Sequence, residues 1–570
     1  MNRTQRILDW SVSLLFLLAA FLYFSVCYGF HTVNLEQLQL FECTKSYFAE
    51  TVRVPGGFSD YLGRFLTQFC YHAWSGALVI ALLLLLVRVL LRALCRRKDA
   101  LVSALTFIPS ILLMMVMCYR FPTISLLTAF ALALAAALAV TRIARPGLRH
   151  GLALMLIPVL YWLLGSFALL FALIMAVREH NRAFAIAAVV LAVACPLVAW
   201  PFLPYPLGRL LYGLSYYKVH DALPVWPWVA ALASAAIVAL AEIGIASGKL
   251  RAWPAFYGLV VAAAIPAVLL SSSRADEQSL EYNILTGKRA WNRILTEAMR
   301  KAPRTYSETA CLNLALCKTG HLGGHMFDYL QDGPETLLPG ENTPHQDGLS
   351  TAEIYYQVGM VNIARRHCYE ALGVTPDYQN SAPVFKLLAE TSIVNGRYAL
   401  ARQYLKALSH TLYYKKWADD LLARFEDGGD PALLEEYAVK RLERYKGPDY
   451  IFDYNRAGIT LSQLLQESPA NMTALSYLLA WYLLNKDLDG FVAACPFEGY
   501  TTTVPKAWQE AFLLYWQRSG AADEELPDFI DKGLAAGLAA FTRDFNANVP
   551  MEQMKQRYGN SYWFYYYFKK

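Results

Sequence analysis

The stretch that decides the fold is Gly29–Trp74, which reads GFHTVNLEQLQLFECTKSYFAETVRVPGGFSDYLGRFLTQFCYHAW. It lies between two apolar runs that are each long enough to cross a bilayer, and it is the only long polar segment in the hydrophobic half of the chain. Its charged residues are Lys45, Arg53, Arg64, Glu36, Glu42, Glu50 and Asp60. Because function is often carried by long loops on a rigid scaffold, we expect the loop 31–72 to be functional.

Hydrophobicity divides the 570 residues into two domains. Residues 1–271 are dominated by Leu, Ala, Val and Ile, which predicts a transmembrane helical domain, and residues 272–570 have an ordinary globular composition. The net charge of +6 is modest, and no basic cluster indicates a nucleic-acid partner. The apolar N-terminal run lacks a small-x-small cleavage site and is followed by more apolar runs, so we do not expect a cleaved signal peptide.

Eight apolar runs qualify as membrane-spanning helices, so the sequence predicts an all-α fold that begins with a polytopic bundle. These runs lie near residues 9–30, 73–95, 101–119, 124–141, 151–177, 183–203, 228–246 and 253–271. The lipid bilayer is therefore the first expected partner, in a bacterial inner membrane.

Basic residues beside the early spans indicate the cytoplasmic side. They place the N-terminus inside and the loop 31–72 outside. Eight spans would return the second half of the chain to the cytoplasm, whereas one missed span would put it outside. The basic residues are Arg3, Arg6, Arg92, Arg96, Arg97, Lys98, Arg142, Arg145 and Arg149.

This topology gathers several ionisable groups at the outer face. Since a carboxylate in or beside hydrocarbon needs water or a cation, we expect Glu36 and Glu242 to share one outward cavity with nearby basic groups. Two alternatives stay open. In the first, Glu242 lies one helical turn from the membrane interface and its side chain extends to that interface. In the second, residues 178–182 form a solvated hairpin tip. The candidate basic and ring groups are His72, Arg178, His180 and Arg182.

The first outer loop resembles that of the GT-C class of membrane glycosyltransferases. The resemblance covers residues 10–95 and consists of an N-in first span, Glu36 followed by Gln and aromatic residues, and the turn Pro55-Gly56-Gly57. It implies a polyprenyl-phosphate sugar as donor and Glu36 as base or as ligand of a divalent metal. The usual pair of acids is replaced here by Glu36-Gln37. Under this hypothesis Arg178 and Arg182 bind the donor phosphate, as a planar guanidinium can.

The second half carries an internal repeat with tetratricopeptide (TPR) spacing. Gly359, Ala364 and Pro376 mark one unit, and Gly396 and Ala401 mark the next. Earlier and later copies carry Ala298, Pro303, Gly320 and the turn Lys486-Asp487. The pattern predicts a TPR-like α-solenoid over residues 272–570, capped by the aromatic segment 558–568. The whole chain resembles an uncharacterised bacterial family of multispanning proteins with TPR-like second halves.

Other candidate sites are weak in this sequence. His321, His325 and Asp328 would share a helix face, but a metal site needs a further ligand, and base rates favour a solvent-facing helix after a turn. Cys311 and Cys317 fit buried structural thiols, and the scattered cysteines predict neither a zinc site nor a disulfide framework.

Two functions follow from these observations. The first is a GT-C-like glycosyltransferase whose repeats hold a protein or peptide acceptor, with Glu36 and Glu242 as catalytic residues. The second is a membrane-anchored TPR scaffold for protein–protein interaction, without catalysis. Eight spans exceed what an anchor needs, which favours the enzyme, whereas cytoplasmic repeats would favour the scaffold.

Overall fold

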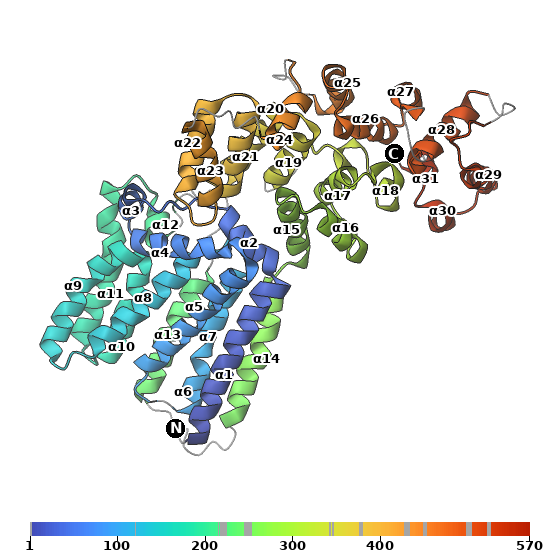
Figure 1. Ribbon diagram of the computed structural model, residues 1–570. Helices are drawn as coiled ribbons and strands as arrows, with labels where there is room; N and C mark the ends of the chain where they lie inside the picture. Colours follow the sequence, from blue (N-terminus) through green and yellow to red (C-terminus); the bar gives the residue numbers. More distant parts are fainter. Residues whose placement is uncertain are drawn as a thin grey trace. The chain divides into compact units, whose positions relative to one another are not determined.

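The computed structural model shows a chain built from helices. It describes residues 3–97, 99–119, 121–214, 216, 225–243, 253–340, 344, 347–375, 380–426, 434–447, 453–497, 504–520 and 526–569. Every regular element in these ranges is helical, so the predicted all-α class is confirmed (Figure 1).

The chain divides into two compact units, and their boundaries differ from a simple cut at 271. Unit 1 consists of Met1–Glu277 together with two later segments, Thr375–Ala382 and Ala407–Ala418. Unit 2 consists of Gln278–Val374, Pro383–Lys406 and Asp419–Lys570. Two pieces of the second half of the sequence thus belong to the unit that contains the apolar helices.

The helices of unit 1 run side by side for the most part (Figure 1). They are α1 (Arg3–Leu22), η1 (Tyr23–Cys27), α2 (Gly29–Gln37), α3 (Lys45–Thr51), α4 (Gly57–Thr67), η2 (Gln68–Tyr71), α5 (Ala73–Leu94), α6 (Ala100–Leu105), α7 (Phe107–Met117), α8 (Ile124–Thr141), α9 (Pro146–Leu164), η3 (Gly165–Phe167), α10 (Ala168–Arg178), α11 (Arg182–Ala199), η4 (Trp200–Phe202), α12 (Leu207–Tyr212), α13 (Trp226–Ile243) and α14 (Trp253–Ser271). By length and apolar composition, seven helical stretches of the described chain can cross a membrane, or eight if the bent pair formed by α14 and α15 (Arg274–Gly287) counts as one.

The two ends of this bundle differ in chemistry. At one end, here called the loop end, Tyr28 donates to the Cys118 carbonyl at 3.4 Å, and Ser125 donates to Asp60 at 2.8 Å. At the other end, here called the basic end, Arg178 donates to the Leu94 carbonyl at 2.7 Å. Since α5 has 22 residues, the two ends are roughly 33 Å apart along it.

The stretch Pro146–Arg178, which contains the run 151–177 predicted above to be one span, is a helical hairpin. Arg149 near its start forms an ion pair with Glu179 just past its end, at 2.6 Å. A straight helix of this length would hold these residues roughly 45 Å apart. The chain reverses at Gly165, whose φ of 64° and ψ of −146° fall in a region that only glycine adopts readily.

This hairpin changes the count of passages through the bundle. Among the described residues, the chain runs from one end to the other nine times, through α1, α5, α6–α7, α8, α9, α10, α11, α13 and α14. It starts at the basic end, where Asp9 pairs with Arg92 at 2.6 Å. It finishes at the loop end, where the Ser273 N–H donates to the Tyr28 hydroxyl at 3.2 Å. An odd number of passages therefore places the two termini of the bundle at opposite ends.

A buried ionic cluster, here called the Asp9 cluster, joins four of these helices near the basic end. Asp9 of α1 and Arg88 of α5 are both fully buried and ion-paired, and Arg92 pairs with the same carboxylate. Tyr257 of α14 donates to Asp9 at 3.0 Å, and the Arg88 guanidinium lies 4.4 Å from the ring centre of Phe107 in α7. Buried charges of this kind are held only when they are paired, so the cluster fixes how α1, α5 and α14 pack.

Unit 2 is a set of shorter helices. With α15, which starts in unit 1, they are α16 (Trp291–Arg300), α17 (Tyr306–Lys318), α18 (Leu322–His325), η6 (Met326–Asp328), η7 (Pro334–Thr336), α19 (Gly348–Val358), α20 (Val361–Val374), α21 (Ala382–Val394), α22 (Tyr398–Ser409), α23 (Lys415–Glu426), α24 (Glu435–Glu443), η10 (Tyr454–Arg456), α25 (Ala457–Glu467), α26 (Met472–Leu484), α27 (Leu488–Ala494), α28 (Lys506–Arg518), α29 (Lys532–Asn546), α30 (Met551–Tyr558) and α31 (Tyr562–Phe568). Helix α21 contributes only its first residue to unit 1, whereas α22 contributes its last three residues and α23 its first four.

Turns between these helices lie where the repeat pattern predicts them. Gly320, Gly359 and Gly396 have φ values of 76°, 111° and 70°, in the left-handed region that favours glycine. Ala364 and Ala401 are fully buried, as expected for small residues between packed helices. Pro376 lies outside the described residues.

The packing differs from a solenoid in which each helix pair contacts only its neighbours. Helix α26 packs against α17, α18 and α19, which precede it by well over a hundred residues, and α28 packs against α18. Arg289 adds a link of the same kind, here called the Arg289 hub: it pairs with Glu353 at 2.6 Å, Glu390 at 2.5 Å and Glu436 at 2.7 Å. The second half of unit 2 therefore folds back on the first.

The aromatic C-terminal segment packs inside unit 2, as predicted. Tyr562, Trp563, Phe564 and Tyr565 are buried in α31. The Glu510 carboxylate of α28 accepts the Tyr562 N–H at 2.7 Å, and the Trp563 indole donates to the Glu510 carbonyl at 3.0 Å. These bonds satisfy the first turn of α31 and fix it against α28.

Candidate functional site

The loop predicted to be functional folds into three short helices and a 3-10 turn at the loop end. Thr44 caps α3 by accepting the Tyr47 N–H, and Gly56, with φ of 79°, precedes α4. Helix α4 packs closely on α8 because Gly63 has no side chain: a Cβ there would lie 2.3 Å from the Ser125 Cα. The loop is thus an ordered layer over the bundle.

Glu36 lies in this layer, near the end of α2, and is only 6% exposed. Its carboxylate accepts a hydrogen bond of 3.4 Å from the hydroxyl of Tyr414. The ring of Tyr71 stacks on Tyr413 at 4.6 Å and meets Tyr414 edge-on at 5.6 Å, and His72 meets Tyr413 edge-on at 5.7 Å. We call these five residues the Glu36 cluster.

The two later segments of unit 1 are hydrogen-bonded to this loop. Ser381 donates to the Gln37 carbonyl at 2.6 Å, and the Ala382 N–H donates to the Gln39 carbonyl at 3.1 Å. The Leu412 N–H donates to the Gln68 side chain at 3.0 Å. The polypeptide far along the chain therefore completes the surroundings of Glu36.

Electrostatics keep the tyrosines of the cluster protonated. Burial, together with the charge of Glu36, raises the pKa of Tyr414 well above its usual value, and the same two causes raise the pKa of Tyr71. Burial also raises the pKa of Tyr413. Protonated hydroxyls can act as hydrogen-bond donors, and the Tyr414 hydroxyl donates to the Glu36 carboxyl group.

His31 takes a structural role beside this cluster. Burial lowers its pKa to about 4, although its bond to the Met117 carbonyl, at 3.0 Å, opposes the shift. Neutral His31 donates that bond. Glu277 accepts the N–H groups of Phe30 and His31 at 2.8 and 2.9 Å, which caps the first turn of α2.

Glu242 lies at the basic end, so the predicted convergence with Glu36 is wrong. Its buried carboxylate pairs with Arg178 at 3.1 Å, Arg96 at 3.2 Å and His180 at 3.6 Å. Arg178 also holds the Leu94 carbonyl at the C-terminal end of α5, whereas Glu36 belongs to the helix that packs at the opposite end of α5. The two carboxylates are separated by about the length of that helix, roughly 30 Å.

The turn 178–182 also lies at the basic end, because the hairpin at Gly165 adds one passage through the bundle. The sequence predicts this turn at the opposite end. Arg182 begins α11, and two residues later Phe184 stacks on His150 at 4.4 Å, beside the pair formed by Arg149 and Glu179. Arg178, His180 and Arg182 therefore cannot serve a site at Glu36, whereas His72 remains beside it.

The candidate metal ligands in unit 2 do not assemble. His325 pairs with Asp328 at 2.7 Å, and the His321 ring lies 5.9 Å from the His325 ring. Within the ranges that the structure describes, no three His, Cys, Asp or Glu side chains are placed to hold a metal ion. Cys311 is buried, and the cysteines in those ranges are all unbridged.

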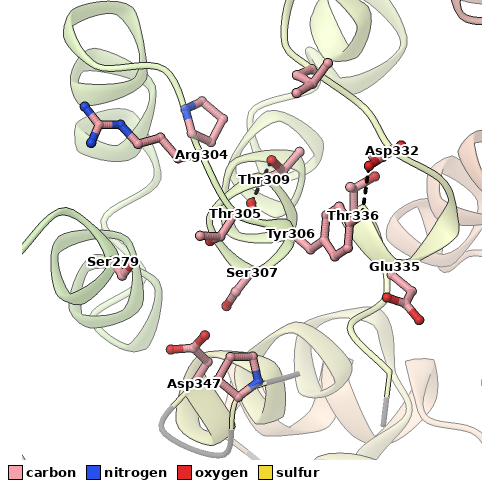
Figure 2. Close-up of a pocket in the computed structure, with 13 residues that line it drawn as sticks. Ser279, Arg304, Thr305, Tyr306, Ser307, Thr309, Asp332, Glu335, Thr336 and Asp347 are labelled. Atoms are coloured by element: carbon pink, nitrogen blue, oxygen red, sulfur yellow. Dashed lines mark hydrogen bonds between the residues drawn. The ribbon is translucent and has the colours of Figure 1, made fainter. Parts of the chain in front are cut away.

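A pocket of about 550 Å³ opens at the start of α17 in unit 2 (Figure 2). The hydroxyl of Tyr306 donates to Asp332 at 2.8 Å, and Asn283 donates to Asp347 at 2.6 Å. The side chains of Ser307 and Asp347 approach the pocket from opposite sides (Figure 2). The lining residues are Ser279, Pro303, Arg304, Thr305, Tyr306, Ser307, Thr309, Leu330, Asp332, Glu335, Thr336, Pro344 and Asp347.

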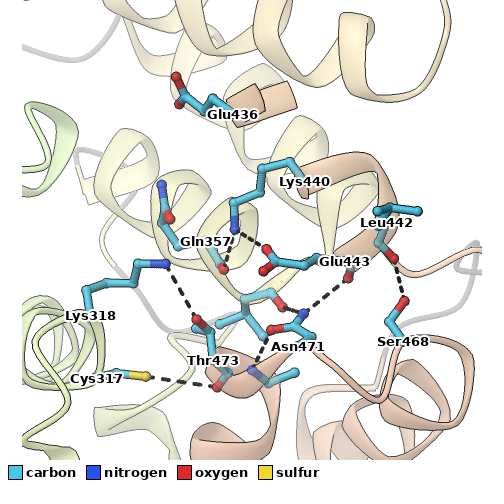
Figure 3. Close-up of polar contacts among 12 residues, drawn as sticks. Cys317, Lys318, Gln357, Glu436, Lys440, Leu442, Glu443, Ser468, Asn471 and Thr473 are labelled. Atoms are coloured by element: carbon cyan, nitrogen blue, oxygen red, sulfur yellow. Dashed lines mark hydrogen bonds and ion pairs between the residues drawn. The ribbon is translucent and has the colours of Figure 1, made fainter. Parts of the chain in front are cut away.

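A buried lysine elsewhere in unit 2 is explained by packing. Lys440 of α24 donates to the Gln357 carbonyl at 2.9 Å and to Glu443 at 3.0 Å, and burial lowers its pKa (Figure 3). Asn471 next to it donates to the Val358 carbonyl at 2.8 Å and caps α26. These bonds satisfy C-terminal carbonyls of α19, so Lys440 and Asn471 together link α19, α24 and α26.

Sequence reasoning missed three features of these sites. Tyr413 and Tyr414 follow a helix of the second half, and nothing in their local pattern indicates contact with residue 36. The pocket at Tyr306 joins segments that are far apart in the chain. The Asp9 cluster did leave a signal, because Asp9 and Arg88 interrupt apolar runs, and such charges need partners.

The comparisons with known proteins give a family but no activity. No curated protein and no solved structure matches the chain. One family spans nearly the whole sequence, from residue 4 to residue 569, and is described as a family of unknown function. The chain therefore belongs to the DUF6057 family.

Proposed function

We propose that this protein is a GT-C-like membrane glycosyltransferase that uses a polyprenyl-phosphate sugar, with its site at the loop end. The observation that carries the proposal is the Glu36 cluster. One buried carboxylate lies at the end of the bundle, in the first loop, and the second half of the chain supplies the Tyr414 hydroxyl that donates to it. A site at this depth meets the head group of a lipid-linked donor.

The orientation follows from charge and from the number of passages. Arg3, Arg6, Arg96, Arg142 and Arg145 lie at the basic end, together with the turn 178–182. We infer that this end faces the cytoplasm, because cytoplasmic loops are enriched in Lys and Arg. If the basic end is inside, the nine passages support a loop end and a unit 2 that lie outside, in a bacterial inner membrane. External repeats can present an acceptor to an external site, as the enzyme requires.

The reaction is a single displacement. The oxygen of an acceptor hydroxyl attacks the anomeric carbon of the sugar, and its proton passes to the Glu36 carboxylate. The bond between the anomeric carbon and the phosphate oxygen breaks, and the polyprenyl phosphate leaves with the electron pair. Low exposure of Glu36 keeps bulk water from competing with the acceptor.

The helix pairs of unit 2 are, in this proposal, a TPR-like array that binds a protein or peptide acceptor. Its support is the spacing of Gly320, Gly359 and Gly396 at helix–helix turns and the burial of Ala364 and Ala401. Stacked helix pairs form extended surfaces that suit long ligands.

Replacing Glu36 by Gln is expected to lower transfer at least about 100-fold, since a general base contributes 10² or more. The measurement uses the full-length protein in lipid nanodiscs with radiolabelled polyprenyl-phosphate sugars, and follows release of polyprenyl phosphate. Glu50→Gln is the matched control, because Glu50 is an exposed acid of the same loop. We expect its rate to equal that of the wild type.

Turnover by a folded Glu36→Gln protein at the wild-type rate would contradict the role of Glu36. If the wild-type protein turned over none of the donors, the proposed glycosyltransferase activity would be contradicted. The variant is checked by its thermal midpoint in the same nanodiscs, so that loss of folding is not mistaken for loss of chemistry.

The alternative function is a membrane-anchored scaffold that binds a partner protein without catalysis. One observation favours it. Glu242, the second predicted catalytic residue, lies with its basic partners at the basic end of the bundle, so its carboxylate cannot act together with Glu36. A scaffold would retain partner binding in Glu36→Gln and show no donor turnover in any variant.

A further inference from the structure

The pocket at the start of α17 has an apolar surface that also carries many oxygen-bearing side chains. Hydroxyl groups come from the run Thr305-Tyr306-Ser307 and its neighbours, and carboxylates come from two separate segments. Its volume of about 550 Å³ lies within the usual range for small-molecule sites, roughly 300–1,000 Å³. The hydroxyl-bearing residues are Ser279, Thr305, Tyr306, Ser307, Thr309 and Thr336.

The charge of the lining excludes anions. The lining carries three carboxylates, those of Asp332, Glu335 and Asp347, and one guanidinium, that of Arg304. Lys569, which is not part of the lining, approaches Asp332 at 3.7 Å and offsets part of one charge. The carboxylates still outnumber the cations, so a phosphate or sulfate group would be repelled.

Tyr306 supplies an apolar surface in a fixed orientation. Its hydroxyl donates to Asp332 at 2.8 Å, and that bond with the adjacent negative charge raises the pKa of the phenol. The residue is 49% exposed, so its ring is accessible in part. An aromatic ring beside carboxylates matches a ligand with an apolar C–H face and a rim of hydroxyl donors.

We propose that this pocket binds a neutral, polyhydroxylated ligand, a sugar unit of a glycan. Carboxylates accept hydrogen bonds from sugar hydroxyls, Ser and Thr hydroxyls both donate and accept, and the Tyr306 ring covers the apolar face of the sugar. Ser279, Thr309 and Thr336 already donate their hydroxyls within the protein, so their free lone pairs can accept hydrogen bonds from sugar hydroxyls. A cationic peptide side chain, which would pair with the carboxylates, is the competing ligand. The proposal does not depend on catalysis by Glu36.

Binding is tested with the full-length protein in lipid nanodiscs, because alkyl-glycoside detergents would compete for such a site. The probes are neutral oligosaccharides (mannose, glucose and N-acetylglucosamine trimers), tri-lysine and inorganic phosphate, measured by thermophoresis. We expect at least one neutral saccharide to bind, with Tyr306→Ala and Asp332→Asn each weakening it at least fivefold. Tyr306→Phe keeps the ring and should weaken it less. Tyr369→Ala, an exposed tyrosine outside the pocket, should have no effect.

Hydrogen exchange gives a second readout that does not need a variant. Saturating saccharide should slow exchange at 303–309 and 330–336 in the wild type. The proposal is overturned if no neutral saccharide binds, if tri-lysine binds instead in an Asp332-dependent way, or if binding is unchanged in Tyr306→Ala and Asp332→Asn. Its failure would leave the test of Glu36 unaffected.

Discussion

Replacing Asp9 by Asn is expected to destabilise the apolar bundle by about 3–5 kcal/mol, the usual effect of removing one partner from a buried ion pair. Asp9 and Arg88 have no exposed surface, and Arg92 pairs with the same carboxylate at 2.6 Å. Without the anion, two guanidinium groups would remain close together among apolar side chains. The thermal midpoint and the yield of monodisperse protein in nanodiscs measure the effect.

Asp276→Asn is the matched control for this substitution. Asp276 is an exposed aspartate of unit 1, so the same chemical change there should alter stability by less than about 0.5 kcal/mol. The double variant Asp9→Leu/Arg88→Met should recover part of the loss, because an apolar pair needs no counter-charge. A stable Asp9→Asn protein would show that the cluster does not hold α1, α5 and α14 together.

Replacing Arg289 by Met is expected to destabilise unit 2 by a similar amount, about 3–5 kcal/mol. Arg289 pairs with three carboxylates, and the side chains of Glu353 and Glu390 are only 3% and 4% exposed. Removing the cation leaves these acids close together with their shared partner gone. Hydrogen exchange of α19, α21 and α24 should rise together, because the hub joins all three.

Arg300→Met provides the comparison. Arg300 pairs with Glu297 at 3.4 Å but is 70% exposed, and such surface pairs contribute about 0–1 kcal/mol. Adding Glu390→Gln to Arg289→Met should restore part of the stability by removing one of the unpaired charges. Equal effects of Arg289→Met and Arg300→Met would contradict the importance of the hub.

Much of the fold can be read from local pattern. Long apolar runs predict helices that can cross a membrane, and glycines such as Gly359 mark the turns between helices, because both signals arise within a few residues. The aromatic segment that ends in Phe568 is predicted to pack, since so many exposed rings would be unfavourable. These predictions depend only on neighbouring residues.

The wrong predictions for the turn 178–182 and for Glu242 have one physical origin. Gly165 reverses the chain inside an apolar stretch whose two arms have the same composition, so hydropathy cannot reveal the turn. One additional passage then moves Arg178, His180, Arg182 and Glu242 to the other end. The candidate site could be predicted only as far as Glu36 and His72, because Tyr413 and Tyr414 reach it through tertiary contacts.

From the nine passages and the basic residues we infer that the second half of the chain lies on the side of the Glu36 loop, outside the cytoplasm. Alkaline phosphatase fused after Lys570 of the full chain reports this side, with green fluorescent protein at the same position and at the N-terminus as paired reporters. We expect an active phosphatase and a dark fluorescent protein after Lys570, and a fluorescent N-terminal fusion. An inactive phosphatase together with a fluorescent C-terminal fusion would show instead that the second half lies in the cytoplasm.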